Sequence, residues 1–245
     1  MKHSFNEFSK IMHGMGRKFE LSKVFNDLLT MSICSFHRTN LQSQLRDKDE
    51  DNEALYMNTI KPYARENLNE FAKAIGILQL NAAQNPYSDI LGEFFMQDIT
   101  KGQNGQYFTP EPICDMMAQM QLSGDDGEFN KRVHDPACGS GRLLLSGAKL
   151  NPKNYFFGAD NSNTCAKMAT LNFFMNGLRG EVAWMNSLSM KFYGGWHINT
   201  NGIGIAPIEA EQSQIWSTPP VRKDIDLKSK EPDEIKFSGD QLTFF

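Results

Sequence analysis

Residues 135–142, Asp-Pro-Ala-Cys-Gly-Ser-Gly-Arg, decide the fold of this chain. They follow Phe-Asn-Lys-Arg-Val-His at residues 129–134 and lead into Leu-Leu-Leu at residues 143–145. Apolar Phe129 and Val133, then an acid, a proline and two closely spaced glycines, and then an apolar triplet predict a strand, a tight turn and the start of a helix. A turn of this kind closes the first strand of an open α/β sheet, at the edge where ligands bind.

The two glycines of this turn indicate a ligand that approaches the backbone closely, because Gly139 and Gly141 lack a Cβ and permit positive φ angles. A dinucleotide fingerprint G-x-G-x-x-G would need a third glycine where this chain has Leu144. Asp135 would repel a pyrophosphate, whereas it would favour a cation such as the α-amino group of S-adenosylmethionine (SAM). The turn therefore favours SAM over a dinucleotide.

The turn resembles the SAM-binding motif of DNA adenine-N6 methyltransferases, especially the modification subunits of type I restriction systems. Gly-Gln-Tyr-Phe-Thr-Pro-Glu-Pro at residues 105–112 resembles the G-Q-[YF]-[FY]-T-P element that these subunits carry about one helix before the SAM motif. The resemblance runs from near Asp89 to near Leu188. It implies an α/β fold with a Rossmann-like methyltransferase sheet, SAM as the cofactor, and DNA methylation in a restriction-modification system.

The strands that follow place further cofactor contacts. Residues 155–159 predict a second strand that ends at Asp160, 19 residues after Gly141, near the spacing at which a carboxylate meets ribose hydroxyls. The alternative is that Asp160 only caps the next helix. Residues 181–185 predict a third strand, after which the family position that approaches adenine is Asn186, and an amide can pair with an adenine edge. The expected cofactor contacts are Tyr107, Phe108, Thr109, Asp135, Pro136, Ala137, Gly139, Gly141, Asp160, Asn161 and Asn186.

The segment before the glycine turn predicts a helix with a defined start. Thr109 is expected to cap it, with Pro110 at its first position, and its free N–H groups could bind the SAM carboxylate. Phe108 and Thr109 are expected to close over the cofactor, although Tyr107 and Phe108 could instead be core aromatics. The expected inward face of the helix is Ile113, Met116, Met117 and Met120.

The residues expected to bind the target adenine depart from the family pattern. The family carries an [ND]-P-P-[YF] loop whose polar groups accept hydrogen bonds from the adenine amino group and whose aromatic ring stacks on the flipped base. Ser-Thr-Pro-Pro-Val at residues 217–221 keeps both prolines, which makes Thr218, Pro219 and Pro220 the candidate catalytic residues. Asn201 is the alternative.

Losing the ring and the acceptor would slow methyl transfer unless other groups replace them. Stacking of a base on an aromatic is worth about 1–3 kcal/mol, and an acceptor aimed at developing charge about 2.7–4 kcal/mol. Trp196 or Trp216 could supply the missing ring. The chain is therefore expected to be a DNA adenine-N6 methyltransferase-like protein, or else an inactive SAM-binding homologue that acts as a regulatory, decoy or partner subunit.

Composition is that of an ordinary globular protein, with 40% hydrophobic and 22% charged residues among 245. There is no run of 18 apolar residues and no apolar signal core, which predicts a cytoplasmic protein without a membrane span. The four cysteines are widely spaced and predict neither a metal site nor disulfides. The net charge of -4, without a basic stripe, predicts a low affinity for DNA phosphates. A partner specificity subunit is therefore expected to bind the DNA.

Three regions are expected. Residues 1–100 show apolar residues at helical spacing and predict a helical region, which by resemblance contacts a second subunit in a homo- or hetero-oligomer. Residues 101–220 form the SAM-binding methyltransferase-like domain, with a sheet curtailed after the third or fourth strand. Residues 221–245 predict a charged tail.

Overall fold

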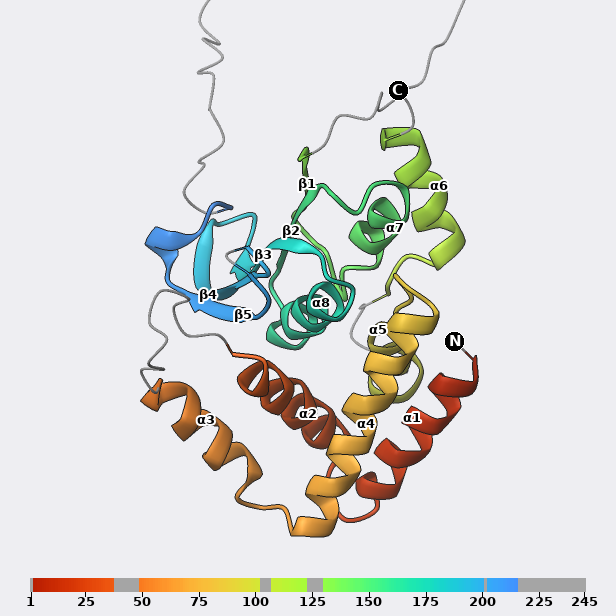
Figure 1. Ribbon diagram of the computed structural model, residues 1–245, viewed down its shortest axis with the longest axis vertical. Helices are drawn as coiled ribbons and strands as arrows, with labels where there is room; N and C mark the ends of the chain where they lie inside the picture. Colours follow the sequence, from red (N-terminus) through yellow and green to blue (C-terminus); the bar gives the residue numbers. More distant parts are fainter. Residues whose placement is uncertain (1, 38–48, 102–106, 123–129, 201, 216–245) are drawn as a thin grey trace, which may run out of the picture.

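The computed structural model describes residues 2–37, 49–101, 107–122, 130–200 and 202–215. The described N-terminal part is mostly helical, as its apolar periodicity predicts, and Figure 1 shows its helices below and beside the sheet. They are α1 (Lys2–Gly16), α2 (Leu21–Ser35), α3 (Glu50–Ile60), α4 (Arg65–Gln84) and α5 (Ile90–Phe94), followed by a π-helical turn at Phe95–Thr100.

These helices share one hydrophobic core with the rest of the molecule. Phe94 lies at its centre, with its ring 5.3 Å from the rings of both Phe8 and Phe25. The same core includes Met168 and Leu171 from a helix of the α/β region. The N-terminal helices are therefore packed directly against the α/β region.

The second half of the chain forms a mixed sheet of five strands within the described residues, which confirms the α/β class. The elements are α6 (Glu111–Leu122), β1 (Arg132–Asp135), α7 (Arg142–Leu150), β2 (Tyr155–Asp160), α8 (Asn163–Met175), β3 (Arg179–Asn186), β4 (Lys191–Ile198) and β5 (Ile205–Ile208). The order is β1-β2-β3-β4-β5, with β1, β2 and β3 parallel. The predicted end of the sheet after the third or fourth strand was wrong, because β4 and β5 add an antiparallel hairpin to β3.

Side-chain alternation divides the parallel strands into two faces. Phe156 and Val182 point to the face that α7 and α8 cover, where they join Leu144, Leu145 and Phe173 in a second core. The neighbouring positions point to the other face. There the Arg132 guanidinium lies 4.3 Å from the centre of the Phe157 ring, and the Arg179 guanidinium 4.7 Å from that of Tyr155.

Three of the four residues expected on the inward face of helix α6 point outward, and the fourth, Met117, is half-buried. Its buried residues are Cys114 and Ala118, whereas Ile113, Met116 and Met120 are 44%, 53% and 76% exposed. Lys149 of α7 pairs with Glu111 at 2.7 Å and with Asp115 at 2.9 Å. These ion pairs and the two small side chains turn the 111–115–118 side toward α7, which leaves the methionine side outward.

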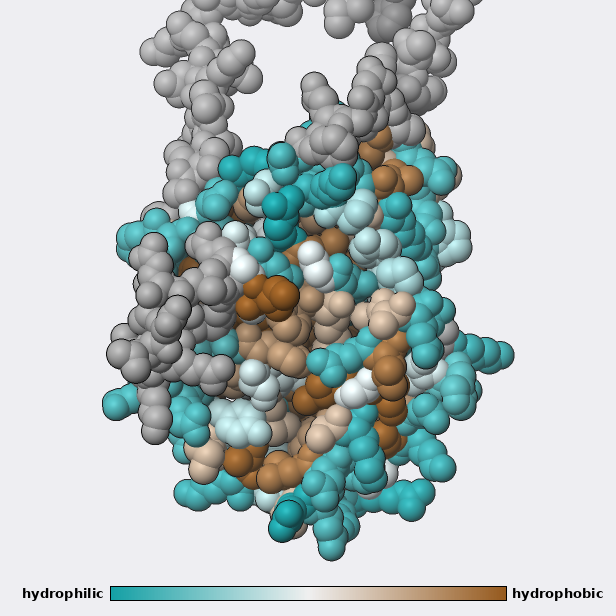
Figure 2. Space-filling view, viewed as in Figure 1, coloured by the Kyte–Doolittle hydropathy of each residue, from teal (hydrophilic) through white to brown (hydrophobic). Residues whose placement is uncertain are grey.

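Hydrophobic residues gather in the middle of the face shown in Figure 2, over α8 and the neighbouring helices α2 and α4. Hydrophilic side chains dominate the outer helices in the same view. None of the described helices combines the length and the apolar character that crossing a bilayer requires.

The chain after β5 is fixed to the sheet by a buried carboxylate. Glu181 of β3 accepts hydrogen bonds from Ser213 Oγ at 2.5 Å and from the Gln214 N–H at 2.8 Å, and His197 Nε2 lies 3.3 Å away. Burial alone would raise the pKa of Glu181, but the adjacent His197 and the hydrogen bonds from Ser213 and Gln214 outweigh it and place the pKa below its ordinary value. Beyond this anchor Ile215 packs against the small cluster of Ala159, Ala183 and Met185.

We predict that Glu181→Gln lowers the free energy of unfolding at pH 7 by about 1–3 kcal/mol. The donors at Ser213 and Gln214 now meet a carboxylate, and in the variant an amide NH2 group, which cannot accept a hydrogen bond, would replace one of its oxygens. A carboxyl whose pKa is lowered by folding adds stability above its unfolded pKa of about 4.3 and loses it as the pH falls through the folded pKa. The wild type should therefore lose stability in that acidic window more steeply than the variant. Urea unfolding at pH 7 and below pH 4.3 measures both effects. The matched control is Glu211→Gln at an exposed position, and equal stability of the two variants would contradict the anchor.

Candidate functional site

The glycine turn joins β1 to α7 as the sequence predicts. Gly139 and Gly141 have φ angles of 55° and 84°, in the left-handed region that favours glycine. The Cys138 N–H donates to the Ala159 carbonyl at 2.9 Å, and the Gly141 N–H to the Cys138 carbonyl at 2.8 Å. The turn is therefore attached to the end of β2, and α7 begins directly after it at Arg142.

Two carboxylates bracket the turn. Asp135 Oδ1 accepts the Ala137 N–H at 3.0 Å, and Asp160 Oδ2 accepts the Gly139 N–H at 2.9 Å. Burial and then the nearby charge of Asp135 raise the pKa of Asp160 above its ordinary value, against the lowering effect of the Ser162 and Gly139 N–H groups. Two acids at the ends of neighbouring strands make this edge attractive to a cation.

Asp160 does not cap helix α8. The cap is Ser162, whose hydroxyl accepts the Cys165 N–H at 3.4 Å, while Asp160 Oδ1 accepts the Ser162 N–H at 2.8 Å. Asp160 thus braces both the glycine turn and the start of α8. A carboxylate has about four acceptor positions, so the two bonds leave acceptor capacity for ligand hydroxyls.

The loop after β3 is tied to the same turn. Asn186 Oδ1 accepts the N–H groups of Leu188 and Ser189, each at 3.0 Å, which directs the amide oxygen into its own loop. Ser187 Oγ donates to the Pro136 carbonyl at 2.6 Å, and Trp184 Nε1 donates to the Asn161 carbonyl at 3.1 Å. The sequence interpretation missed Ser187 and Trp184, since no spacing rule marks either residue.

Phe108 lies over the glycine turn and also packs against the first hydrophobic core, as the core-aromatic alternative predicted for this residue. A Cβ added at Gly139 would stand 2.8 Å from the Phe108 ring, and that ring stacks on Phe95 at 5.8 Å. Tyr107 is 74% exposed and is therefore not a core aromatic. Helix α6 begins at Glu111, one residue later than expected, and the Pro110 carbonyl accepts the N–H groups of Ile113 and Cys114.

Two hollows meet at Phe108. One of about 90 Å³ lies over the turn and is lined by Tyr107, Phe108, Thr109, Cys114, Asp135, Ala137, Cys138, Gly139, Ser140, Arg142 and Leu143. The second, of about 260 Å³, shares Phe108 and Arg142 with it and includes Glu93 and Glu111. The segment around Phe108 therefore separates the turn from an acidic hollow beside α5.

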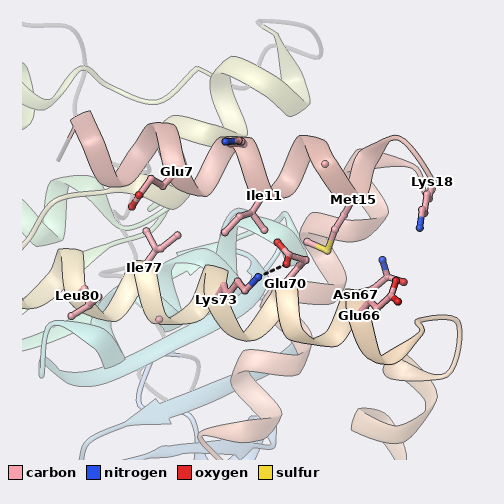
Figure 3. Close-up of a pocket in the computed structure, with 13 residues that line it drawn as sticks. Glu7, Ile11, Met15, Lys18, Glu66, Asn67, Glu70, Lys73, Ile77 and Leu80 are labelled. Carbon is pink, nitrogen blue, oxygen red and sulfur yellow. Dashed lines mark hydrogen bonds and ion pairs between the residues drawn. The ribbon is translucent and has the colours of Figure 1, made fainter.

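A larger hollow of about 850 Å³ lies elsewhere, between α1 and α4 (Figure 3). Ile11, Ile77 and Leu80 line it together with charged residues, among them the Glu70–Lys73 pair at 2.6 Å. Its lining residues come from these two helices and the residues next to them, whereas the glycine turn and its carboxylates line the smaller hollows. Its volume alone would favour this hollow as the ligand site. The glycine turn and the carboxylates of Asp135 and Asp160 favour the carboxyl ends of the strands instead.

The candidate catalytic residues Thr218, Pro219 and Pro220, the alternative Asn201, and Trp216 lie outside the described residues. The described part of the 199–204 hairpin follows Ile198, which pairs with Gly180 at the amino end of β3. That end is opposite the glycine turn. Trp196 packs against both hydrophobic cores, which does not favour it as a base-stacking ring.

Comparison with known proteins identifies related sequences. The N-6 DNA Methylase family model matches residues 86–206. The MjaVIII methylase subunit of a type I restriction enzyme from Methanocaldococcus jannaschii is 30% identical over 98 residues, which cover 37% of this chain and 16% of that protein. The MpnII methylase subunit of a type I restriction enzyme from Mycoplasma pneumoniae is 25% identical over 125 residues, which cover 46% and 22%.

A solved structure is also similar in part. The type I restriction-modification system methyltransferase subunit from Streptococcus thermophilus aligns with a TM-score of 0.37 at 14% identity, over 72% of this chain and 55% of that one. The chain spans less than a quarter of the length of the two relatives named above, at 16% and 22%.

The family match includes the whole site described here. It extends over the Phe108 segment, the glycine turn, Asp160 and Asn186. Together with the named methylase subunits, it confirms the resemblance drawn from the turn and from the G-Q-Y-F-T-P element. Residues 86–206 of the chain are similar to the N-6 DNA methylase family, and the similar sequences include methylase subunits of type I restriction enzymes.

Proposed function

We propose that this chain binds SAM at the carboxyl ends of β1, β2 and β3 and serves in adenine-N6 methylation of DNA in a restriction-modification system. The observation that carries the proposal is the pair of carboxylates, Asp135 and Asp160, on either side of a glycine turn in an N-6 DNA methylase region. Open α/β sheets bind ligands at this edge.

Each contact of the proposed site follows from its chemistry. Asp135 takes the α-amino group of SAM, and Asp160 accepts from the ribose hydroxyls with the acceptor capacity that its two N–H bonds leave. The amide nitrogen of Asn186 faces the adenine, since its oxygen is bonded within the loop. Small ligands usually fill about 300–1,000 Å³, so SAM must extend from the small hollow at Phe108 along the strand ends.

SAM supplies an electrophilic methyl group, and the residues of this chain position it. Transfer also requires acceptors for the adenine amino group, which we assign to the Thr218–Pro220 segment in preference to Asn201. Support for this choice comes from the 199–204 hairpin, whose described part lies at the amino end of β3. The relatives are named methylase subunits, and we propose that this chain likewise works with a partner that holds the DNA.

A second candidate is a SAM-binding subunit without turnover. It is favoured by the absence of an [ND]-P-P-[YF] tetrapeptide from the whole sequence. The two candidates share the cofactor site and differ only in whether the methyl group moves.

The test is calorimetric titration of the purified chain with SAM, followed by transfer of a labelled methyl group to mixed-sequence DNA. Saturable binding together with label on adenine supports the enzyme. Binding without label on DNA supports the second candidate. An absence of SAM binding would refute both.

We predict that Asp135→Asn and Asp160→Asn each weaken SAM binding about tenfold or more, since each removes a charge-assisted hydrogen bond. The matched control is Asp98→Asn, which removes an acid that pairs with His13 at 2.8 Å away from the turn. Unchanged affinity in both site variants would contradict the proposed contacts.

The raised pKa of Asp160 predicts a pH dependence. Its ionised form accepts from ribose hydroxyls, so the affinity for SAM should fall as the pH is lowered toward a pKa above the ordinary value of about 3.9. The same titration of Asp160→Asn, carried from neutral pH to the lowest pH at which both proteins stay folded, should give a flatter profile. Parallel profiles for the two proteins would show that Asp160 does not control the effect.

A further inference from the structure

One buried carboxylate outside the cofactor contacts holds the glycine turn from behind. Asp89 is 6% exposed and precedes α5. Its Oδ2 accepts Ser140 Oγ at 2.5 Å and Arg142 Nε at 3.0 Å. Its Oδ1 accepts the Gly92 N–H and Asn172 Nδ2, each at 2.8 Å. Four donors from three separate parts of the chain thus converge on this group.

The Asp89 and Ser140 side chains lie close to Gly92 of α5. A Cβ added at Gly92 would stand 2.1 Å from Asp89 Oδ2 and 2.4 Å from Ser140 Oγ. Such distances leave no room for any side chain at this position. Gly92 therefore permits the contact between Asp89 and the turn.

Arg142 extends the same network to the segment over the turn. Its guanidinium reaches Glu93 Oε2 at 3.4 Å and the Thr109 carbonyl at 3.5 Å, in addition to Asp89. Its side chain is 9% exposed. The arginine of the turn is thus committed to partners within the chain, and it links α5 to the residues beside Phe108.

We propose that Asp89 is a positioning residue for the cofactor turn, which rests on the proposed function of SAM binding. Its two bonds to Ser140 and Arg142 fix the residues on both sides of Gly141. Asn172 of α8 bonds to Asp89 and also to the Ser140 carbonyl at 2.9 Å, so the turn is held from two elements. Asp89 therefore determines where the turn presents its backbone to SAM, without touching the cofactor.

The experiment compares Asp89→Asn, Ser140→Ala and the wild type. Asp89→Asn keeps the shape of the side chain but replaces one of its two acceptor oxygens with an amide NH2 group. Ser140→Ala removes the hydrogen bond from the turn to Asp89. The matched control is Ser88→Ala, at the residue before Asp89. It removes the hydroxyl contacts with Asn81 and with the Asn85 carbonyl and does not touch the turn. SAM affinity is measured by calorimetry at 10 °C with proteins shown to be folded, and hydrogen exchange is followed for residues 137–145.

We expect Asp89→Asn to raise the Kd for SAM about tenfold or more and Ser140→Ala about threefold or more, with Ser88→Ala unchanged. Exchange should accelerate at residues 137–145 and stay unchanged in β3. A lower melting temperature with wild-type affinity and wild-type exchange at the turn would overturn the proposal, because a purely structural role moves stability alone. If Asp89→Asn does not fold, Ser140→Ala alone decides in the same way.

The two proposals fail differently. A wild type that does not bind SAM refutes the proposed function, and the exchange data then still report whether Asp89 orders the turn. A wild type that binds, with variants of equal affinity, refutes only the positioning role.

Discussion

The Asp89 carboxylate is the interaction on which the arrangement of the two parts of this chain depends. It caps α5 through Gly92, fixes the glycine turn through Ser140 and Arg142, and reaches α8 through Asn172. A buried carboxylate is stable only when its acceptor positions are satisfied, and here four donors meet it. The helical part and the α/β part are thus joined at the point where the cofactor chemistry is expected.

The site itself is built from groups that brace one another. Asp160 fixes the Gly139 N–H, and Ser187 fixes the Pro136 carbonyl from the loop after β3. The ends of the three parallel strands are therefore connected before any ligand arrives, which lowers the ordering cost of binding. The two acids that remain at this edge give it a preference for a cationic, hydroxyl-bearing ligand, which agrees with the N-6 DNA methylase family match.

Much of the fold around the turn could be predicted from sequence, because its signals are local. The strand, glycine turn and helix at residues 132–150 follow from an acid, a proline, two glycines and an apolar triplet in the sequence. Strands β2 and β3 follow in the same way. Strand β4 was missed because its centre, Gly194-Gly195, lowers strand propensity, and it is stabilised by pairing with β3.

Other features depend on contacts between distant residues. The orientation of α6 was wrong because Lys149 pairs with Glu111 and Asp115 and overrides the stripe of methionines. The resemblance begins near Asp89, but the contacts of this residue could not be predicted, since its partners Ser140, Arg142 and Asn172 lie 51, 53 and 83 residues away. Asp160 ends β2 as the sequence predicted, but its bond to Gly139 becomes visible only in three dimensions.

The central claim is that SAM occupies the carboxyl ends of β1, β2 and β3. The most direct measurement is a crystal structure of the chain soaked or grown with SAM. The account predicts the methionine end beside Asp135, the ribose on Asp160 and the adenine near Asn186. Cofactor density in the hollow between α1 and α4, with the glycine turn bare, would contradict it.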